Sequence, residues 1–157
     1  MKVLRSGKIL VICALLAGLP ACGFTPVYGT NSETGAILSD IEVAAPNTRE
    51  EYFLVRDLEE QLGRNLSAKH ILNYDIELSE QGLELAGASR SHVLGRVSYQ
   101  LISKSTGQTI ASGAVESFTS FLTRDNLSVA AQRDASERLI KILADKLTTD
   151  ISLKLLM

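Results

Sequence analysis

Few side chains in this sequence could carry acid–base or metal chemistry. His70 and His92 are its only histidines, and a neutral imidazole can ligate a metal ion. Asp75 and Glu77 lie two residues apart, so in a strand both carboxylates would share one face and could form an acid–base pair. Such residues are more often the solvated face of a strand, and the sequence contains no nucleophile elbow, zinc-protease motif or phosphate-binding glycine loop. We therefore expect no metal, no catalytic residues and no enzymatic activity.

Cys22 is the residue whose context predicts a covalent modification. A basic start is followed by an apolar run over residues 9–19, and the segment ends in Leu19-Pro20-Ala21-Cys22. A basic head, about a dozen apolar residues and a small residue before the cut are typical of a secretory signal peptide. The run is too short to cross a bilayer, which takes roughly 20 apolar residues.

The four residues that end this segment resemble a bacterial lipobox. In such signals the cysteine thiol receives a diacylglycerol, the peptide before it is removed, and the new N-terminus is acylated. The resemblance implies that residues 1–21 are a signal peptide and that Cys22 is lipidated, with no other cofactor. A plain signal peptide with a coincidental cysteine and an uncleaved anchor remain the alternatives. Gly23 stands where inner-membrane retention signals typically have Asp, which favours the outer membrane.

The composition of the chain limits its partners. Cleavage before Cys22 would leave 136 residues, enough for one domain with a substantial core, with 13 basic and 18 acidic side chains and a net charge near −5. This balance argues against a general nucleic-acid binder, which needs a basic surface to displace counterions from phosphates. Because Cys13 leaves with the signal peptide, the sequence predicts no disulfide and no cysteine-based metal site.

A long segment without acidic residues interrupts this acidic chain. No Asp or Glu occurs between Glu84 and Glu116, whereas Arg90, Arg96 and Lys104 lie within the segment. An Arg guanidinium can hold a phosphate group with two parallel hydrogen bonds, so these three cations are candidates for binding a phosphorylated ligand. Lys and Arg also protect strand edges against aggregation. The sequence leaves these two interpretations equally supported.

The elements that would position these residues begin after a segment without periodicity. Residues 22–36 contain three glycines and one proline and predict an extended tether. Residues 37–43 predict a short strand. Thr48 and Glu51 fit a capping box, and the apolar stripe that follows predicts a helix over about 48–64.

Apolar and polar residues then alternate with the period of a strand. This pattern predicts strands over 70–80, 93–101 and 109–122, a turn within 81–89 and a tight hairpin at 103–108. The alternation slips around Gly113, which predicts a bulge there. A second apolar stripe predicts a long helix over about 127–151.

The order of these elements, β-α-β-β-β-α, predicts a single α+β domain over residues 37–157. Two amphipathic helices cannot bury their stripes alone, and each strand has one apolar face. Both helices are therefore expected to pack on one face of a four-stranded mixed sheet. The opposite face of the sheet would remain polar.

Two segments of the chain carry a family resemblance. The residues Ala21-Cys22-Gly23-Phe24-Thr25-Pro26-Val27-Tyr28-Gly29 and the helical segment Ala130-Ala131-Gln132-Arg133-Asp134-Ala135-Ser136-Glu137-Arg138 resemble the LptE family of lipopolysaccharide-assembly lipoproteins, in the form common in alphaproteobacteria. The order of elements agrees with this family, and the resemblance covers essentially the whole mature chain.

The resemblance implies a non-enzymatic outer-membrane lipoprotein. Members of the family plug the lumen of the β-barrel LptD, assist its assembly and bind lipopolysaccharide directly. By that resemblance the partners would be an LptD-like barrel and lipopolysaccharide, with no nucleic acid. The basic residues of the family do not match this chain one by one, so Arg90, Arg96 and Lys104 are lipopolysaccharide-binding candidates from charge pattern alone. The alternative function is an accessory lipoprotein of another envelope lipid-transport system.

Overall fold

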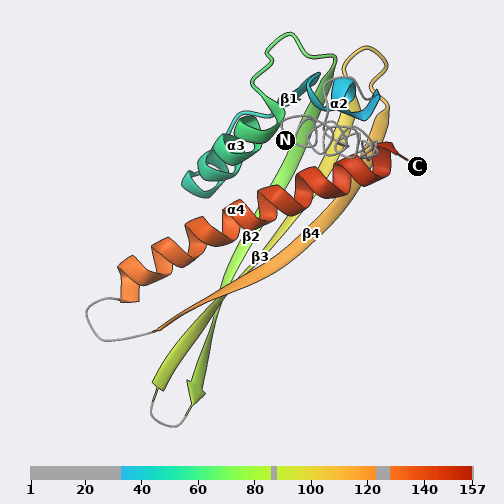
Figure 1. The fold of residues 1–157 in the computed structure, drawn as a ribbon. Helices are drawn as coiled ribbons and strands as arrows, with labels where there is room; N and C mark the ends of the chain where they lie inside the picture. Colours follow the sequence, from blue (N-terminus) through green and yellow to red (C-terminus); the bar gives the residue numbers. More distant parts are fainter. Residues whose placement is uncertain (1–32, 86–87, 123–127, 157) are drawn as a thin grey trace, which may run out of the picture.

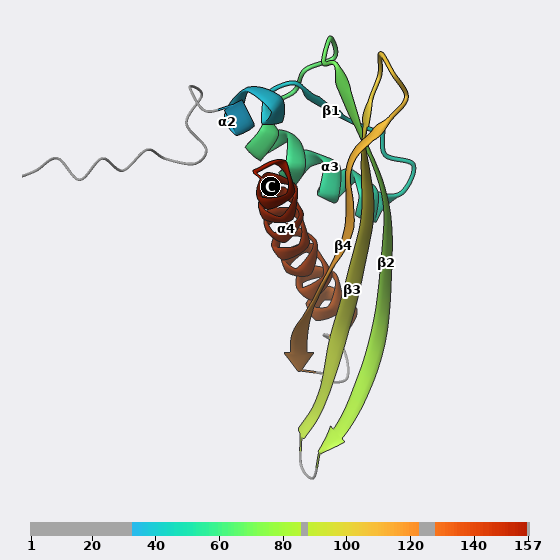
Figure 2. The same ribbon diagram turned by 90° about the vertical axis from the view of Figure 1, so that its right-hand side faces the viewer.

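The computed structural model describes residues 33–85, 88–122 and 128–156. The predicted signal peptide, Cys22 and most of the predicted tether lie outside these residues. Within the described ranges seven elements follow one another, and helices lie on one side of a four-stranded sheet of order β1-β2-β3-β4 (Figures 1 and 2). The predicted α+β class and its mixed sheet are therefore confirmed.

The sheet consists of one short strand and three long ones. Strand β1 (Ile41–Val43) pairs in parallel with the start of β2 (His70–Leu85), and β2, β3 (Ala88–Ser103) and β4 (Thr109–Leu122) pair antiparallel. The hairpin of β2 and β3 extends past the ends of β4 and α4 (Figure 1).

Helix α3 (Arg49–Leu62) begins at the capping box that the sequence predicted. The hydroxyl of Thr48 accepts a hydrogen bond from the N–H of Glu51, at 3.2 Å. The carboxylate of Glu51 reaches one residue further back than in the standard motif and accepts from the N–H of Asn47, at 2.6 Å. The helix ends at Gly63, whose φ of 83° is a conformation that side chains rarely adopt.

The long helix α4 (Ser128–Leu155) lies along the sheet and forms most of the core with it. It packs on β4 and β3 and also contacts α3 (Figure 2). Leu139, Leu143 and Leu147, which the sequence placed on its apolar stripe, are fully buried. Gly95 on β3 lets the helix approach closely, because a Cβ there would lie 2.7 Å from a methyl carbon of Leu143.

The first predicted strand is partly wrong. Residues Glu33–Leu38 form a short helix, α2, and only Ile41–Val43 of the predicted 37–43 are a strand. The predicted tether is likewise too long, because α2 includes its last residues. Leu38, the last residue of α2, is buried in the hydrophobic core. A short apolar run supports a helical turn or a strand equally well, and tertiary packing decides between them.

Two further boundaries differ from the sequence prediction. Strand β2 continues past the predicted end at residue 80 through Gly82 to Leu85, and β3 begins at Ala88, before the predicted residue 93. The pairing of β3 and β4 shifts at Ile110, which is the extra residue between Thr109 and Ala111, and not at Gly113. The tight turn with Gly107 at φ 70° is confirmed.

Candidate interaction surface on the open face of the sheet

No helix of the described residues covers the second side of the sheet (Figure 2). We call this side the open face. Along β3 the residues from Ser91 to Leu101 alternate strictly, with the odd ones buried toward the helices and the even ones facing outward. The register sets the outward residues in cross-strand rows, namely Asn73/Gln100/Ser112, Asp75/Ser98/Ala114, Glu77/Arg96/Glu116, Ser79/Leu94/Phe118 and Gln81/His92/Ser120.

The three predicted lipopolysaccharide-binding cations do not form a cluster. Arg90 and Arg96 are six residues apart on β3, about 20 Å at the rise of a strand, and Lys104 follows the far end of that strand. Arg96 forms an ion pair with Glu116 on β4, and Lys104 forms one with Glu42 on β1. Arg90 is exposed, and its guanidinium has no hydrogen-bond or ion-pair partner among the described residues.

The middle of the open face is therefore acidic, although the β3 sequence alone looks basic. Asp75 and Glu77 both face outward from β2, as their spacing predicted, and neither has a partner among the described residues. Glu116 lies across from them on β4 with a side chain that is 65% exposed. We call Asp75, Glu77 and Glu116 the acidic band; Arg96 is the one cation within its rows. The sequence missed this band because Glu116 joins it through strand pairing.

An exposed apolar group lies directly beside the acidic band. Phe118 is 61% exposed, and Leu94 and Leu122 are 38% and 47% exposed. Leu94 and Phe118 pair across β3 and β4 in the row next to Glu77/Arg96/Glu116. The ring of His92 stacks on Phe118 with 5.5 Å between ring centroids. We call Leu94, Phe118, Leu122 and His92 the distal patch.

The acidic band and the distal patch meet in a shallow hollow. This hollow has a volume of about 430 Å³, and its walls include Glu77, Arg96 and Glu116 on one side and Leu94 and Phe118 on the other. A second open hollow, of about 510 Å³, continues from Arg96 along the polar rows. Neither encloses a ligand-sized cavity, so the surface suits contact with another macromolecule better than an enclosed small molecule.

The two histidines lie far from each other. His70 pairs with Ser103 and His92 with Gln81, so 11 residues of β2, about 36 Å, separate their positions. The Nδ1 atom of His70 is 3.1 Å from the carbonyl oxygen of Asp40. Among the described residues, no three His, Cys, Asp or Glu side chains come together in a group that could hold a metal ion.

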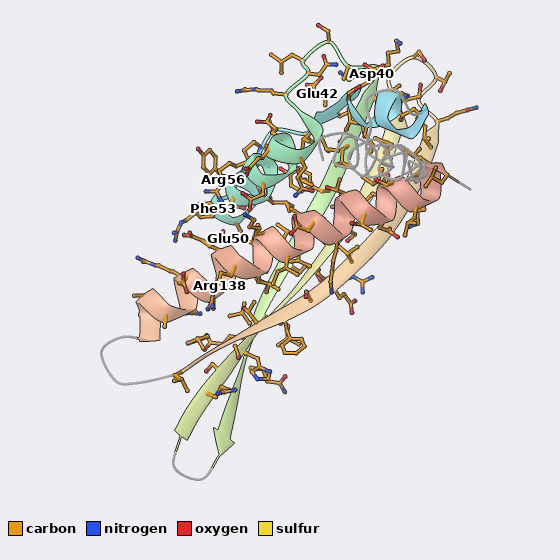
Figure 3. All side chains as sticks on the ribbon, in the orientation of Figure 1. Asp40, Glu42, Glu50, Phe53, Arg56 and Arg138 are labelled. Atoms are coloured by element: carbon orange, nitrogen blue, oxygen red, sulfur yellow. The ribbon has the colours of Figure 1, made fainter. Side chains whose placement is uncertain are left out.

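Charged and aromatic side chains contact each other on the helical side of the molecule. Arg49 and Arg56 flank the ring of Phe53 on α3, at 5.2 and 5.0 Å from its centroid; Figure 3 labels Phe53 and Arg56. Arg49 also pairs with Glu137 of α4 at 3.0 Å. The pair of Arg49 and Glu137 joins the two helices.

A polar cluster fastens the end of α4 to the sheet. The Nζ of Lys154 donates to the carboxylate of Asp150 at 2.8 Å, to the carbonyl of Ser112 at 2.7 Å and to the hydroxyl of Tyr99 at 3.2 Å. The hydroxyl of Tyr99 donates to Asp150. Gly113 leaves room for this cluster, since a Cβ there would lie 2.2 Å from Nζ.

The cluster changes the acidity of its members. Burial raises the pKa of Tyr99 to about 12, and its hydrogen bond to Asp150 acts in the same direction. Burial would raise the pKa of Asp150, but hydrogen bonds from Lys154 and Tyr99 outweigh it and lower this pKa below its ordinary value. The cluster is therefore a charged anchor at neutral pH.

The architecture is similar to that of solved lipoprotein structures. A candidate lipoprotein from Caulobacter crescentus CB15 is 23% identical with a TM-score of 0.66, and the match covers 80% of this chain and 96% of that chain. A minor lipoprotein from Acinetobacter baumannii is 17% identical with a TM-score of 0.56, over 72% of this chain and 88% of that chain. At these identities the similarity is one of fold. No family model and no curated protein matches the sequence.

None of the helices in the described ranges is both long and apolar enough to span a membrane.

Proposed function

We propose that this chain is a lipid-anchored lipoprotein of the outer membrane that occupies the lumen of an LptD-like β-barrel and assists the assembly of lipopolysaccharide. The observation that carries the proposal is the open face, a long polar sheet surface on a domain whose sequence starts with a lipobox-like signal. A barrel lumen presents a polar wall, so a domain with one polar sheet face fits against it. The fold likeness to proteins described as lipoproteins supports the anchored envelope part of the proposal.

The anchoring itself follows from the proposed chemistry at Cys22. Each buried acyl methylene contributes about 0.8 kcal/mol, so a diacylglycerol and an N-acyl chain hold a domain firmly at a membrane surface. Replacing Cys22 with Ser should release the chain from the outer-membrane fraction, which fractionation with an antibody readout measures. A Cys13→Ser variant is the matched control and should remain in the membrane.

The partner is tested by purification from detergent-solubilised outer membranes. A C-terminally tagged chain should retain a large outer-membrane β-barrel in equal molar amount. Recovery of inner-membrane transporter subunits in place of the barrel would support the alternative function, an accessory lipoprotein of another envelope lipid-transport system. Recovery of the chain alone would contradict both.

Direct lipopolysaccharide binding is the finer part of the proposal, and Arg90 is its strongest residue. Arg90 is exposed and has no partner among the described residues, whereas a phosphate must displace a carboxylate to reach Arg96 or Lys104. We expect Arg90→Glu to weaken lipopolysaccharide binding several-fold, and more than Lys104→Glu does. Arg64→Glu, which reverses a 71% exposed cation after α3, is the control. Binding to immobilised lipopolysaccharide that survives in a folded Arg90→Glu, Arg96→Glu, Lys104→Glu triple variant would remove these three residues from the account.

A further inference from the structure

The distal patch is an apolar surface whose cover has to come from outside the described fold. Phe118 faces outward from β4, its ring stacks on that of His92, and Leu94 lies beside it in the same row. Phe118 is 61% exposed, and a partner that covers its ring stabilises the complex by about 25 cal/mol per Å² of apolar area removed from water. The patch is contiguous with the acidic band, so whatever covers the patch also meets its carboxylates.

The charges of the acidic band decide what kind of group fits. Arg96 lies between Glu77 and Glu116 in one cross-strand row, and its guanidinium forms an ion pair with Glu116. The carboxylate of Glu77 has no hydrogen-bond or ion-pair partner among the described residues. Together with Asp75, three carboxylates stand against two cations, Arg96 and Lys146 of α4, which also lines the hollow. Arg96 pairs with Glu116, and the Nζ of Lys146 donates to the carbonyl of Glu116 at 2.8 Å. The charges without a partner among the described residues are therefore the carboxylates of Asp75 and Glu77. An anionic phosphate placed over these rows would meet net repulsion, whereas a Lys or Arg side chain would be attracted.

We propose that the acidic band and the distal patch bind one polypeptide segment of the partner barrel, in which a Lys or Arg side chain lies next to an apolar side chain. The apolar side chain covers Phe118 and Leu94, and the cation reaches Glu77 and Asp75. Neighbouring outward rows are about 7 Å apart along a strand, a distance that two adjacent side chains span. The identity of the partner rests on the proposed function; the site and its chemistry rest on the open face.

Two other occupants fit the surface less well. An isologous pair of chains would place one acidic band against another, and on each side the nearby cations Arg96 and Lys146 already have partners within the chain. A phosphorylated amphiphile could cover Phe118 and place a phosphate at Arg90, which pairs with Leu122 at the far end of the distal patch, but it would leave the carboxylates of Glu77 and Asp75 without a partner. Both remain outcomes of the experiment.

Matched variants separate this surface from the rest of the molecule. Glu77→Lys reverses an exposed carboxylate of the open face, and Glu60→Lys makes the same change in charge on α3, at an exposed residue that also has no partner among those described. Phe118→Ser removes a ring that is 61% exposed, and Tyr52→Ser removes one that is 59% exposed on the helical side. All four variants change surface residues, and thermal unfolding checks that each is folded.

The measurement is the amount of barrel that each tagged variant retains from solubilised outer membranes, followed over a range of salt concentrations. We expect Glu77→Lys and Phe118→Ser each to lower the retained barrel about tenfold, equivalent to about 1.4 kcal/mol, while Glu60→Lys and Tyr52→Ser retain it as the unchanged chain does. Higher salt should weaken retention by the unchanged chain and have less effect on Glu77→Lys.

The occupant is identified by a photo-reactive phenylalanine analogue at position 118 in intact envelopes. We expect an adduct that mass spectrometry maps to a barrel peptide with Lys or Arg within a few residues of the crosslink. An adduct with a lipid-sized molecule, an adduct with a second copy of this chain, or undiminished retention in both open-face variants would overturn the docking site and leave the proposed function standing. If the unchanged chain retains no barrel, the proposed function fails, and the docking site fails with it.

Discussion

Asp150 helps to hold the C-terminal end of the long helix α4 against the sheet. Its carboxylate receives hydrogen bonds from Lys154 and Tyr99, which hold its pKa below the ordinary value of 3.8. Because the pKa is lowered in the folded state, the stabilisation is fully present above the unfolded value. It is lost as the pH falls through the folded pKa.

Asp150→Ala should therefore lower the free energy of unfolding by about 1 kcal/mol at pH 7, a modest loss because the side chain is 31% exposed and water replaces part of the hydrogen bonding. The difference between the variant and the unchanged chain should shrink as the pH falls below about 4. Urea unfolding at pH 7, 5 and 3 measures it. A difference that stays constant down to pH 3 would show that the carboxylate charge contributes nothing.

The acidic band of the open face could be predicted from the sequence only in part. The outward direction of Asp75 and Glu77 follows from their spacing and is confirmed. The pairing of Arg96 with Glu116 depends on the register of β3 against β4, which alternation alone does not set. A strand whose own sequence is basic can thus lie in an acidic surface, because the neighbouring strands contribute the carboxylates.

At the scale of elements, Gly95 controls how closely α4 approaches the sheet. A Cβ at this position would lie 2.7 to 3.0 Å from side-chain carbons of Leu143, Leu78 and Leu139. Gly95→Ala should therefore destabilise the fold by about 1–3 kcal/mol through overpacking.

Gly82 on β2 is the matched control for Gly95. A Cβ there has no atom within 4 Å, so Gly82→Ala should leave stability unchanged or raise it by up to about 1 kcal/mol. Thermal unfolding of both variants provides the comparison. Equal effects of the two substitutions would mean that α4 does not pack against Gly95.

The apolar stripe of α4 makes a second prediction at this scale. Leu143 is fully buried, and its neighbour Ile142 is 37% exposed. Leu143→Ala should cost roughly 2–5 kcal/mol as a core truncation, and Ile142→Ala should cost about 1 kcal/mol or less. Chemical denaturation measures both, and a loss under 1 kcal/mol at Leu143 would mean that this stripe does not face the sheet.

Most elements could be predicted because their signals are local. The capping box at Thr48 sets the start of α3, and alternation sets the three long strands. Residues 33–38 could not be predicted, because a six-residue helix has too few turns to show a period. The bulge was expected at Gly113 because glycine often marks one; the structure uses this glycine to admit Lys154 and bulges at Ile110.

At the scale of the molecule, the chain separates two surfaces with different properties. The helical side buries the core, and Arg49 of α3 pairs with Glu137 of α4 there. The open face keeps unpaired carboxylates and an exposed Phe118. The hairpin of β2 and β3 extends past α4 (Figure 1). This division is the physical basis for assigning the open face to a partner.

Native mass spectrometry of the complex purified from outer membranes reports the partner and the modification of Cys22 in one experiment. We expect one chain bound to one β-barrel, in which the chain has lost residues 1–21 and carries a diacylglycerol and an N-acyl chain on Cys22. A chain of unprocessed mass, or a processed chain that emerges from the membrane without a barrel, would contradict this expectation.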